Sequence, residues 1–304
     1  MNLGTAPAQP GSKKLPGQIA PEKYTRERVL SVHRWAPHLF SFRTTRPAAF
    51  RFKPGQWARL GVYRDDEHPG LAGLTPDSIR GDDPLHCGPR FVWRAYSVVS
   101  ASYDEYLEFY SIVVPDGDFT SHLSGIEVGD ELLVEKASYG FLTLDRFQGG
   151  RDLWMLASGT GLAPFISVLQ EPETWERFAR LVLVHSVREA GELAYRDTLG
   201  ALSQHPVVGE HLQADPARLV VVPIVTRAPL GAASPATLNC RIPVAIESGQ
   251  LEQAAGVALT HEHSRIMICG NPDMVDDVRD ALILRGFGVS RSSKPGQIAV
   301  ENYW

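Results

Sequence analysis

The chain has 304 residues, which is more than one hydrophobic core usually supports and suits two domains. Its 43% hydrophobic and 21% charged residues are typical of a globular protein, and no apolar run reaches the length of about 18 residues that a membrane span needs. The net charge of -5 and the lack of a Lys/Arg cluster argue against a nucleic-acid partner.

The cysteines and the N-terminus indicate the compartment. Cys87, Cys240 and Cys269 are widely separated and lack C-x-x-C spacing, so we expect no disulfide framework, metal site or iron–sulfur cluster. Residues 1–23 are rich in Pro, Gly and Lys and lack the apolar core of a secretory signal. We therefore expect a flexible N-terminal tail and a cytoplasmic protein.

Residues 24–148 consist of short β-rich runs separated by Gly, Pro and Asp, which is typical of an all-β domain. Residues 65–90 lose this periodicity and predict a long inserted loop, which is either functional or a tolerated insertion. The spacing of the runs suits a small barrel or sandwich. Strands are predicted over Thr25–His33, His38–Thr44, Trp57–Tyr63, Arg94–Ser100, Tyr106–Val113 and Glu131–Lys136.

Residues 149–304 alternate apolar runs with segments of helical length, and the pattern changes near Arg146–Arg151. Uninterrupted apolar runs are expected of parallel strands buried on both faces, so this half predicts a doubly wound α/β domain. The predicted strands are Asp152–Ala157, Leu181–Ser186, Leu219–Val225 and Arg265–Gly270, and the predicted helices are Ala163–Gln170, Glu192–Gln204, Ile242–Ser248 and Asp273–Arg285.

A glycine-rich turn joins the first of these strands to its helix. Gly159, Thr160 and Gly161 lie where backbone N–H groups at a helix start can face a phosphate, and Pro164 suits the first helical turn. A G-x-G run by itself is weak evidence, and a plain strand-to-helix turn explains it equally well.

Three arginines follow later elements of the α/β half, namely Arg188, Arg227 and Arg241. Ligands of open α/β sheets bind beyond the carboxyl ends of the strands, and guanidinium groups match phosphate oxygens in a bidentate way. Their joint placement indicates the extra phosphate of NADP, although each arginine alone is also compatible with a solvated surface.

The run Arg94-Ala95-Tyr96-Ser97 lies on a predicted strand, where alternation sends Arg94 and Tyr96 to one face. A cation can hold a pyrophosphate while a tyrosine ring covers a flat heterocycle. The same run is also compatible with half-buried barrel surface.

Together these motifs give the sequence a family resemblance. From about Tyr24 to Trp304 it resembles the bacterial ferredoxin/flavodoxin–NADP reductases, whose motifs occur here in the same order. The matching segments are Arg94–Ser97, Val114–Leu123, Gly159–Phe165, His185–Arg188 with Glu192–Tyr195, Arg241–Pro243 with Ile246–Gly249, and Cys269–Met274.

The resemblance implies an antiparallel FAD-binding β-barrel followed by a doubly wound parallel-sheet NADP-binding domain. It implies catalytic roles beside the flavin for Ser97, Cys269 and Trp304, the last as an aromatic lid. The implied FAD contacts are Arg94, Ala95, Tyr96, Ser97, Ser111, Val113, Gly117, Phe119, Thr120, Ser121 and Trp304. The implied NADP contacts are Thr160, Gly161, Arg188, Thr226, Arg227, Arg241, Cys269, Gly270, Asn271, Asp273 and Met274.

The implied activity is electron transfer between NADPH and a ferredoxin or flavodoxin through FAD, in a monomer without a metal ion. A reductase component of an oxygenase is an alternative, but such proteins usually carry clustered cysteines, which this chain lacks. A non-enzymatic NADP-binding redox sensor is another, and the combination of Arg94, Tyr96 and Trp304 argues against it.

Overall fold

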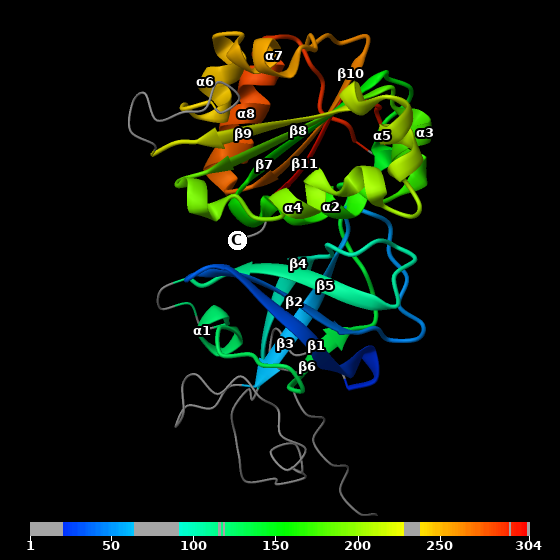
Figure 1. The fold of residues 1–304 in the computed structure, drawn as a ribbon, viewed down its shortest axis with the longest axis vertical. Coiled ribbons are helices and arrows are strands. Elements are labelled where there is room, and N and C mark those ends of the chain that lie inside the picture. Colours follow the sequence, from blue (N-terminus) through cyan, green and yellow to red (C-terminus); the bar gives the residue numbers. More distant parts are fainter. Residues whose placement is uncertain are drawn as a thin grey trace, which may run out of the picture.

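The computed structural model of the chain describes residues 21–63, 91–114, 117, 119–227, 238–291 and 293–302. An antiparallel sheet lies below a helix-flanked parallel sheet in the view of Figure 1. This arrangement confirms the predicted fold class. Within the described part of the chain, no helix combines the length and the apolar character needed to cross a bilayer.

Six antiparallel strands form the first sheet, in the spatial order β4-β3-β6-β1-β2-β5. Val98, just beyond β4, forms an antiparallel bridge with Phe109 of β5, so the edges of the curled sheet approach each other as in a barrel. Phe40, Phe42 and Leu60 are among the fully buried side chains that fill its interior. The strands are β1 (Tyr24–Ala36), β2 (Leu39–Thr45), β3 (Trp57–Tyr63), β4 (Phe91–Ser97), β5 (Tyr106–Ile112) and β6 (Glu131–Glu135).

The predicted strands of this sheet are confirmed, with one shift at β4. This strand runs from Phe91 to Ser97 rather than from Arg94 to Ser100. The physical reason is the barrel closure, because the residues after Ser97 turn toward β5, where the Val99 N–H donates to the Glu108 carbonyl at 2.8 Å. The predicted loop over residues 65–90 lies outside the described residues, as does the predicted tail except for the 3-10 turn η1 (Pro21–Lys23).

Five parallel strands form the second sheet, in the order β11-β10-β7-β8-β9. The chain starts at the centre with β7, moves outward to β9 and returns to the other side with β10. The sheet therefore has its topological switch point between β7 and β10, where open α/β sheets bind ligands. The strands are β7 (Asp152–Ser158), β8 (Arg180–Val187), β9 (Leu219–Val225), β10 (Ser264–Gly270) and β11 (Ile298–Asn302), of which β11 was not predicted.

Helices cover both faces of the parallel sheet (Figure 1). Side chains of β7 alternate between the two layers: Leu153 and Met155 face the layer of α2 to α5, and Trp154 and Leu156 face that of α6 to α8. Both faces are thus apolar, which explains the uninterrupted apolar runs in the sequence. The helices are α1 (Thr120–Leu123) in the first domain, then α2 (Ala163–Leu169), α3 (Pro172–Arg177), α4 (Arg196–Gly200), α5 (Gly209–Ala214), α6 (Ile242–Glu247), α7 (Gln250–Ala255) and α8 (Pro272–Leu284).

The prediction of one helix over Glu192–Gln204 is wrong. The segment is broken into the 3-10 turn η4 (Ala190–Glu192), the short α4 and the 3-10 turn η5 (Leu202–Gln204). Tyr195 interrupts it because its backbone is left-handed, with φ 59°, so a right-handed helix cannot pass through it. The remaining 3-10 turns are η2 (Leu144–Arg146), η3 (Gly159–Leu162) and η6 (Pro216–Arg218).

The two domains share one hydrophobic cluster. Leu39, Tyr110 and Leu142 of the first half belong to the same buried cluster as Phe165 and Met267 of the second. The interface is therefore a packed layer, which holds the sheets in a fixed relation. The boundary between residues 148 and 149 stays a prediction, and it falls between the end of β6 and the start of β7.

Candidate active site

A cleft of about 680 Å³ lies between the two sheets and takes side chains from both. From the first domain come the predicted residues Arg94, Ala95, Tyr96, Ser97, Ser111, Gly117, Phe119 and Thr120. From the second come Thr160, Gly161 and Gly270, which follow β7 and β10 on either side of the topological switch point. The structure thus brings the two sequence motifs to one site.

The glycine-rich turn η3 fits against the end of β10 only because it lacks side chains. A Cβ on Gly161 would lie 2.3 Å from the carbonyl oxygen of Cys269, and one on Gly270 would lie 2.2 Å from the Ser158 hydroxyl oxygen. Gly270 also has a φ of +140°, which favours glycine. Both glycines are therefore required for the close approach of the two strand ends at the cleft.

Hydrogen bonds from two neighbouring segments, the end of β8 and the residue after β10, hold the turn and the end of β7 in place. His185, at the end of β8, is 3% exposed, and its Nε2 lies 3.2 Å from the Gly159 carbonyl oxygen. Burial lowers the pKa of His185 to about 4, so the ring is neutral near pH 7 and donates its Nε2–H to that carbonyl. On the other side, the Asn271 N–H donates to the Ser158 hydroxyl at 3.0 Å.

On the opposite wall, β4 presents the Arg94–Ser97 run to the cleft. Arg94 is exposed, and its Nη1 donates to the Trp93 carbonyl at 2.9 Å. The Tyr96 hydroxyl lies 2.9 Å from the Ser111 hydroxyl, and its ring packs 5.5 Å from that of Phe119. Burial raises the pKa of Tyr96 to about 12, so the phenol stays neutral near pH 7.

The loop after β5 completes this wall. The Thr120 hydroxyl accepts the Val114 N–H at 3.0 Å, which ties the start of α1 to the end of the strand region. A Cβ on Gly117 would lie 2.7 Å from the Thr120 hydroxyl oxygen. Val113, also a predicted contact, packs against the barrel core instead of lining the cleft, because its neighbours Ile112 and Val114 face the opening.

Several cleft residues were not found from the sequence, among them Trp57 and Glu301. Trp57 pairs with Ser97 across β3 and β4, and its Nε1–H donates to the Glu301 Oε1 at 2.7 Å. The other oxygen of Glu301 accepts the Leu142 N–H at 3.2 Å. Strand pairing is what places these residues there, and no local motif reveals it. The further unpredicted lining residues are Arg59, Trp93, Tyr110, Ile112, Val114, Ala163 and Asn302.

Cys269 lies behind the cleft wall. It is fully buried, and burial together with the negative charge of Glu301 holds the pKa of its thiol well above the usual value. The thiol is therefore protonated and enclosed at neutral pH, and its backbone carbonyl, rather than its sulfur, abuts Gly161. A role for the Cys269 sulfur in catalysis stays a prediction.

The remaining predicted contacts among the described residues do not line the cleft. Arg188 and Arg227 are exposed after β8 and β9, and their backbones are joined, with the Arg227 N–H donating to the Arg188 carbonyl at 2.8 Å. Trp304 lies outside the described residues. Ser121 follows the first residue of α1, Thr226 precedes Arg227, Arg241 precedes α6, and Asn271, Asp273 and Met274 lie at the start of α8.

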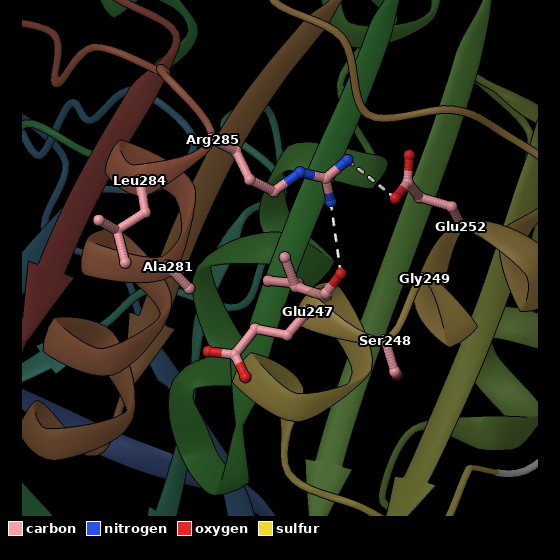
Figure 2. Close-up of a pocket in the computed structure, with 8 residues that line it drawn as sticks. Glu247, Ser248, Gly249, Glu252, Ala281, Leu284 and Arg285 are labelled. Carbon is pink, nitrogen blue, oxygen red and sulfur yellow. Dashed lines mark hydrogen bonds and ion pairs between the residues drawn. The ribbon is translucent and has the colours of Figure 1, made fainter.

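A second pocket, of about 470 Å³, lies among α6, α7 and α8 (Figure 2). Arg285 donates to the Ile246 carbonyl at 3.4 Å and forms an ion pair with Glu252 at 2.9 Å, so these two of the three charged lining residues are paired with each other, and the third, Glu247, is exposed. None of the predicted site residues lines it. Among the described residues there is no group of three His, Cys, Asp or Glu side chains arranged to hold a metal ion.

Comparisons with known proteins agree with this geometry. A family model described as the oxidoreductase NAD-binding domain matches residues 155–280. The ferredoxin–NADP reductase of Pseudomonas aeruginosa is 38% identical over 278 residues, which cover 90% of this chain and 95% of that protein. Ferredoxin–NADP reductase A of Sorangium cellulosum is 40% identical over 281 residues, which cover 91% of this chain and 89% of that protein.

A solved structure extends the similarity to three dimensions. The ferredoxin NADP+ reductase from Neisseria gonorrhoeae, with bound FAD and NADP, matches with a TM-score of 0.76 at 38% identity. The match covers 92% of this chain and 98% of that one. Because relatives of this identity are matched over nearly their whole length, the chain belongs to the ferredoxin–NADP reductase family.

Proposed function

We propose that this protein is an FAD-dependent oxidoreductase that transfers electrons between NADPH and a small one-electron carrier, ferredoxin or flavodoxin. The observation that carries the proposal is one cleft lined by both the Arg94–Ser97 run and the glycine-rich turn. Two cofactor-binding surfaces that face each other are what a hydride donor and a hydride acceptor require.

The first wall of the cleft fits FAD. Arg94 is exposed and forms no ion pair within the described part of the chain, so its guanidinium is available to a pyrophosphate. Tyr96, fixed by Ser111 and Phe119, offers a ring face to the flavin. A bound FAD supplies an acceptor for hydride at N5 and releases electrons singly. Ser97 is the proposed neighbour of N5, and covering of the other flavin face by Trp304 stays a prediction.

The second wall fits NADP. Thr160 and Gly161 lie in a turn that packs closely against Gly270 at the switch point, where backbone N–H groups can approach a pyrophosphate. Arg188 and Arg227 extend from adjoining strand ends and are the proposed ligands of the extra phosphate. Thr226, Arg241 and the residues that begin α8 are the further proposed contacts.

Tyr110 adds an independent sign of a ligand. It lines the cleft, it is 3% exposed, and its hydroxyl has no hydrogen-bond partner among the described residues. A buried hydroxyl left without a partner costs about 1–3 kcal/mol, which an acceptor on a bound cofactor would relieve. The residue therefore supports a polar ligand at this position of the cleft.

Ferredoxin is the carrier named for the Pseudomonas and Sorangium relatives, and a relative in Rhodobacter capsulatus is named a flavodoxin/ferredoxin–NADP reductase. We extend both carriers to this protein as proposed partners. The monomeric state and the cytoplasmic location remain predictions from the sequence.

The test of the function uses the purified full-length chain. We expect the absorbance of oxidised flavin, its bleaching by NADPH without oxygen, and reduction of added ferredoxin or flavodoxin by the bleached enzyme. A colourless protein after reconstitution with FAD, or a flavin that NADPH does not bleach, would show that the proposal is wrong. Bleaching without transfer to either carrier would retain the flavin and NADPH and reject both partners.

A further inference from the structure

The Arg188–Tyr195 segment of the second domain is anchored on the first domain at two points. The Tyr195 hydroxyl donates to the Glu108 Oε1 of β5 at 2.8 Å. His38, in the turn between β1 and β2, has its Nε2 2.9 Å from the Glu192 Oε1. The path of this segment after β8 therefore depends on contacts with the other domain.

Glu192 connects the anchor to the backbone of Arg188. Its second carboxylate oxygen accepts the N–H of Arg188 at 2.9 Å and that of Glu189 at 3.3 Å. Burial raises the pKa of Glu192, but the hydrogen bonds from the Arg188 N–H and from His38 outweigh this effect and leave the pKa below its ordinary value. The carboxylate is therefore ionised near pH 7 and is a strong acceptor for these donors.

The connection continues from Arg188 to Arg227. The Arg227 N–H donates to the Arg188 carbonyl at 2.8 Å, and the Thr226 N–H donates to the Val187 carbonyl at 2.9 Å. Both arginine side chains are exposed. A continuous set of contacts therefore runs from His38 in the first domain, through Glu192, to the backbone that carries both arginines.

The backbone of Tyr195 shows that the segment is held in place. Its φ of 59° is left-handed, which is uncommon for a residue other than glycine. The side chain is 3% exposed, and its ring lies 4.5 Å from that of Trp35 and 5.4 Å from that of Tyr110. Such a conformation persists only where the surroundings impose it, and here the first domain supplies those surroundings.

The need to hold the two domains together does not by itself explain the contact between Glu192 and His38. A separate seam joins them at α2, where the Ser167 hydroxyl donates to the Ser100 carbonyl at 2.8 Å and the Gln170 Nε2 donates to the Val99 carbonyl at 2.9 Å. That seam makes no use of the Arg188–Tyr195 segment. The His38–Glu192 contact differs because it ends on the backbone of Arg188.

We propose that Glu192, together with His38, is a positioning residue for coenzyme selectivity. It fixes the backbone from which Arg188 and Arg227 extend, so that the preference for the coenzyme with the extra phosphate depends on contact between the domains. The inference rests on the proposed function, in which these two arginines bind that phosphate. Glu192 acts through them, because its own carboxylate is already engaged by His38 and by two backbone N–H groups.

The test measures KM and kcat for NADPH and NADH in the holoenzyme, with ferricyanide as the acceptor. We expect Glu192→Ala to raise the KM for NADPH about tenfold and that for NADH less than about twofold, with kcat unchanged. His38→Ala leaves the bonds from Glu192 to the Arg188 backbone in place and should raise the KM for NADPH about threefold. Glu192→Gln keeps an acceptor for the Arg188 N–H and should restore most of the selectivity.

Glu252→Ala is the matched control. Like Glu192, Glu252 contacts a nitrogen of a basic side chain, here that of Arg285 at 2.9 Å (Figure 2), and accepts a backbone N–H, here that of Leu259 at 2.7 Å. These partners all lie in the second domain, away from the two arginines of the proposed site. The ratio of the two KM values should therefore equal that of the unaltered enzyme.

The inference is wrong if Glu192→Ala and His38→Ala lower the melting temperature while both KM values change in the same proportion. If Glu192→Ala does not fold, His38→Ala decides the question alone. Arg227→Ala separates the positioning role of Glu192 from the proposed binding of the phosphate by Arg227. If Arg227→Ala reduces selectivity and the other two variants do not, only the positioning role is rejected. If Arg227→Ala also leaves selectivity unchanged, the role of the arginine is rejected with it.

Discussion

The cleft between the sheets and the pocket among α6, α7 and α8 are of comparable size, about 680 Å³ and about 470 Å³. They differ in how their polar groups are satisfied. In the pocket, Arg285 is bonded to Glu252 and to the Ile246 carbonyl (Figure 2). In the cleft, neither the Arg94 guanidinium nor the buried Tyr110 hydroxyl is satisfied by the described residues: Arg94 forms no ion pair with them, and the hydroxyl forms no hydrogen bond with them. Polar groups left available distinguish a binding site better than volume does.

The glycines of the two regions also differ, in the reason why each position requires glycine. In the cleft, Gly161 is required by close approach, since a Cβ there would meet the Cys269 carbonyl. In the pocket, Gly249 has a φ of +76°, and a Cβ added there would meet no atom of the described residues within 4 Å, so this glycine serves the turn between α6 and α7. One glycine creates a surface for a ligand, and the other shapes a connection.

The largest effect is expected from a side chain at Gly161. In Gly161→Val, the Cβ and methyl groups would push the glycine-rich turn away from the end of β10, so we expect kcat/KM with NADPH to fall about 100-fold. The bound flavin should remain, because its proposed contacts lie on the other wall. Steady-state kinetics and the flavin absorbance measure the two effects. Gly200→Ala, where an added Cβ meets nothing within 4 Å, is the control, and equal losses in both variants would refute the argument.

A smaller effect, on coenzyme binding alone, is expected from Arg227. Loss of a charge-assisted hydrogen bond to phosphate costs about 1.5–3 kcal/mol, so Arg227→Ala should raise the KM for NADPH roughly 10- to 100-fold and leave that for NADH nearly unchanged. Arg285→Ala is the comparison from the second pocket and should alter neither KM. Equal changes with both coenzymes in Arg227→Ala would contradict phosphate recognition at this residue.

His185, which lies behind the cleft, should make the free energy of unfolding of the protein depend on pH. Its folded pKa of about 4 lies below the ordinary value of 6.5, so the folded state binds fewer protons. The stabilisation is complete above pH 6.5 and is lost as the pH falls toward 4. By pH 5, the free energy of unfolding has fallen by about 2 kcal/mol. Urea unfolding at pH 7.5 and pH 5 measures it. In His185→Gln the loss between these two values should be smaller by about that amount, and an identical loss in both proteins would rule out the histidine as its source.

The smallest effect is expected in the second pocket. Arg285→Ala removes a partly exposed ion pair and a long hydrogen bond, so it should lower the free energy of unfolding by about 1 kcal/mol or less. Coenzyme kinetics should not change. A large rise in the KM for NADPH would break the comparison between the two regions, because it would give the pocket a part in coenzyme binding.

Local patterns in the sequence predicted most of the fold. The bounds of β3 and β9 agree with the predicted runs, and the Arg94–Ser97 and Thr160–Gly161 motifs both reach the cleft. These features depend on alternation, apolar runs and turn residues within a few positions of one another. A single-helix interpretation of Glu192–Gln204 was wrong because a contact with a distant strand imposes the conformation of Tyr195.

The sequence by itself therefore determined the two kinds of sheet, their order along the chain and the main residues on each wall of the cleft. Only the tertiary structure decided which other residues border it, such as Trp57 and Glu301, which are bonded across the two domains. It also decided that Glu192 meets His38 and that the Cys269 thiol is enclosed. The physical reason is that short-range patterns encode periodicity and turns, whereas contacts between residues far apart in the chain exist only after the sheets have packed.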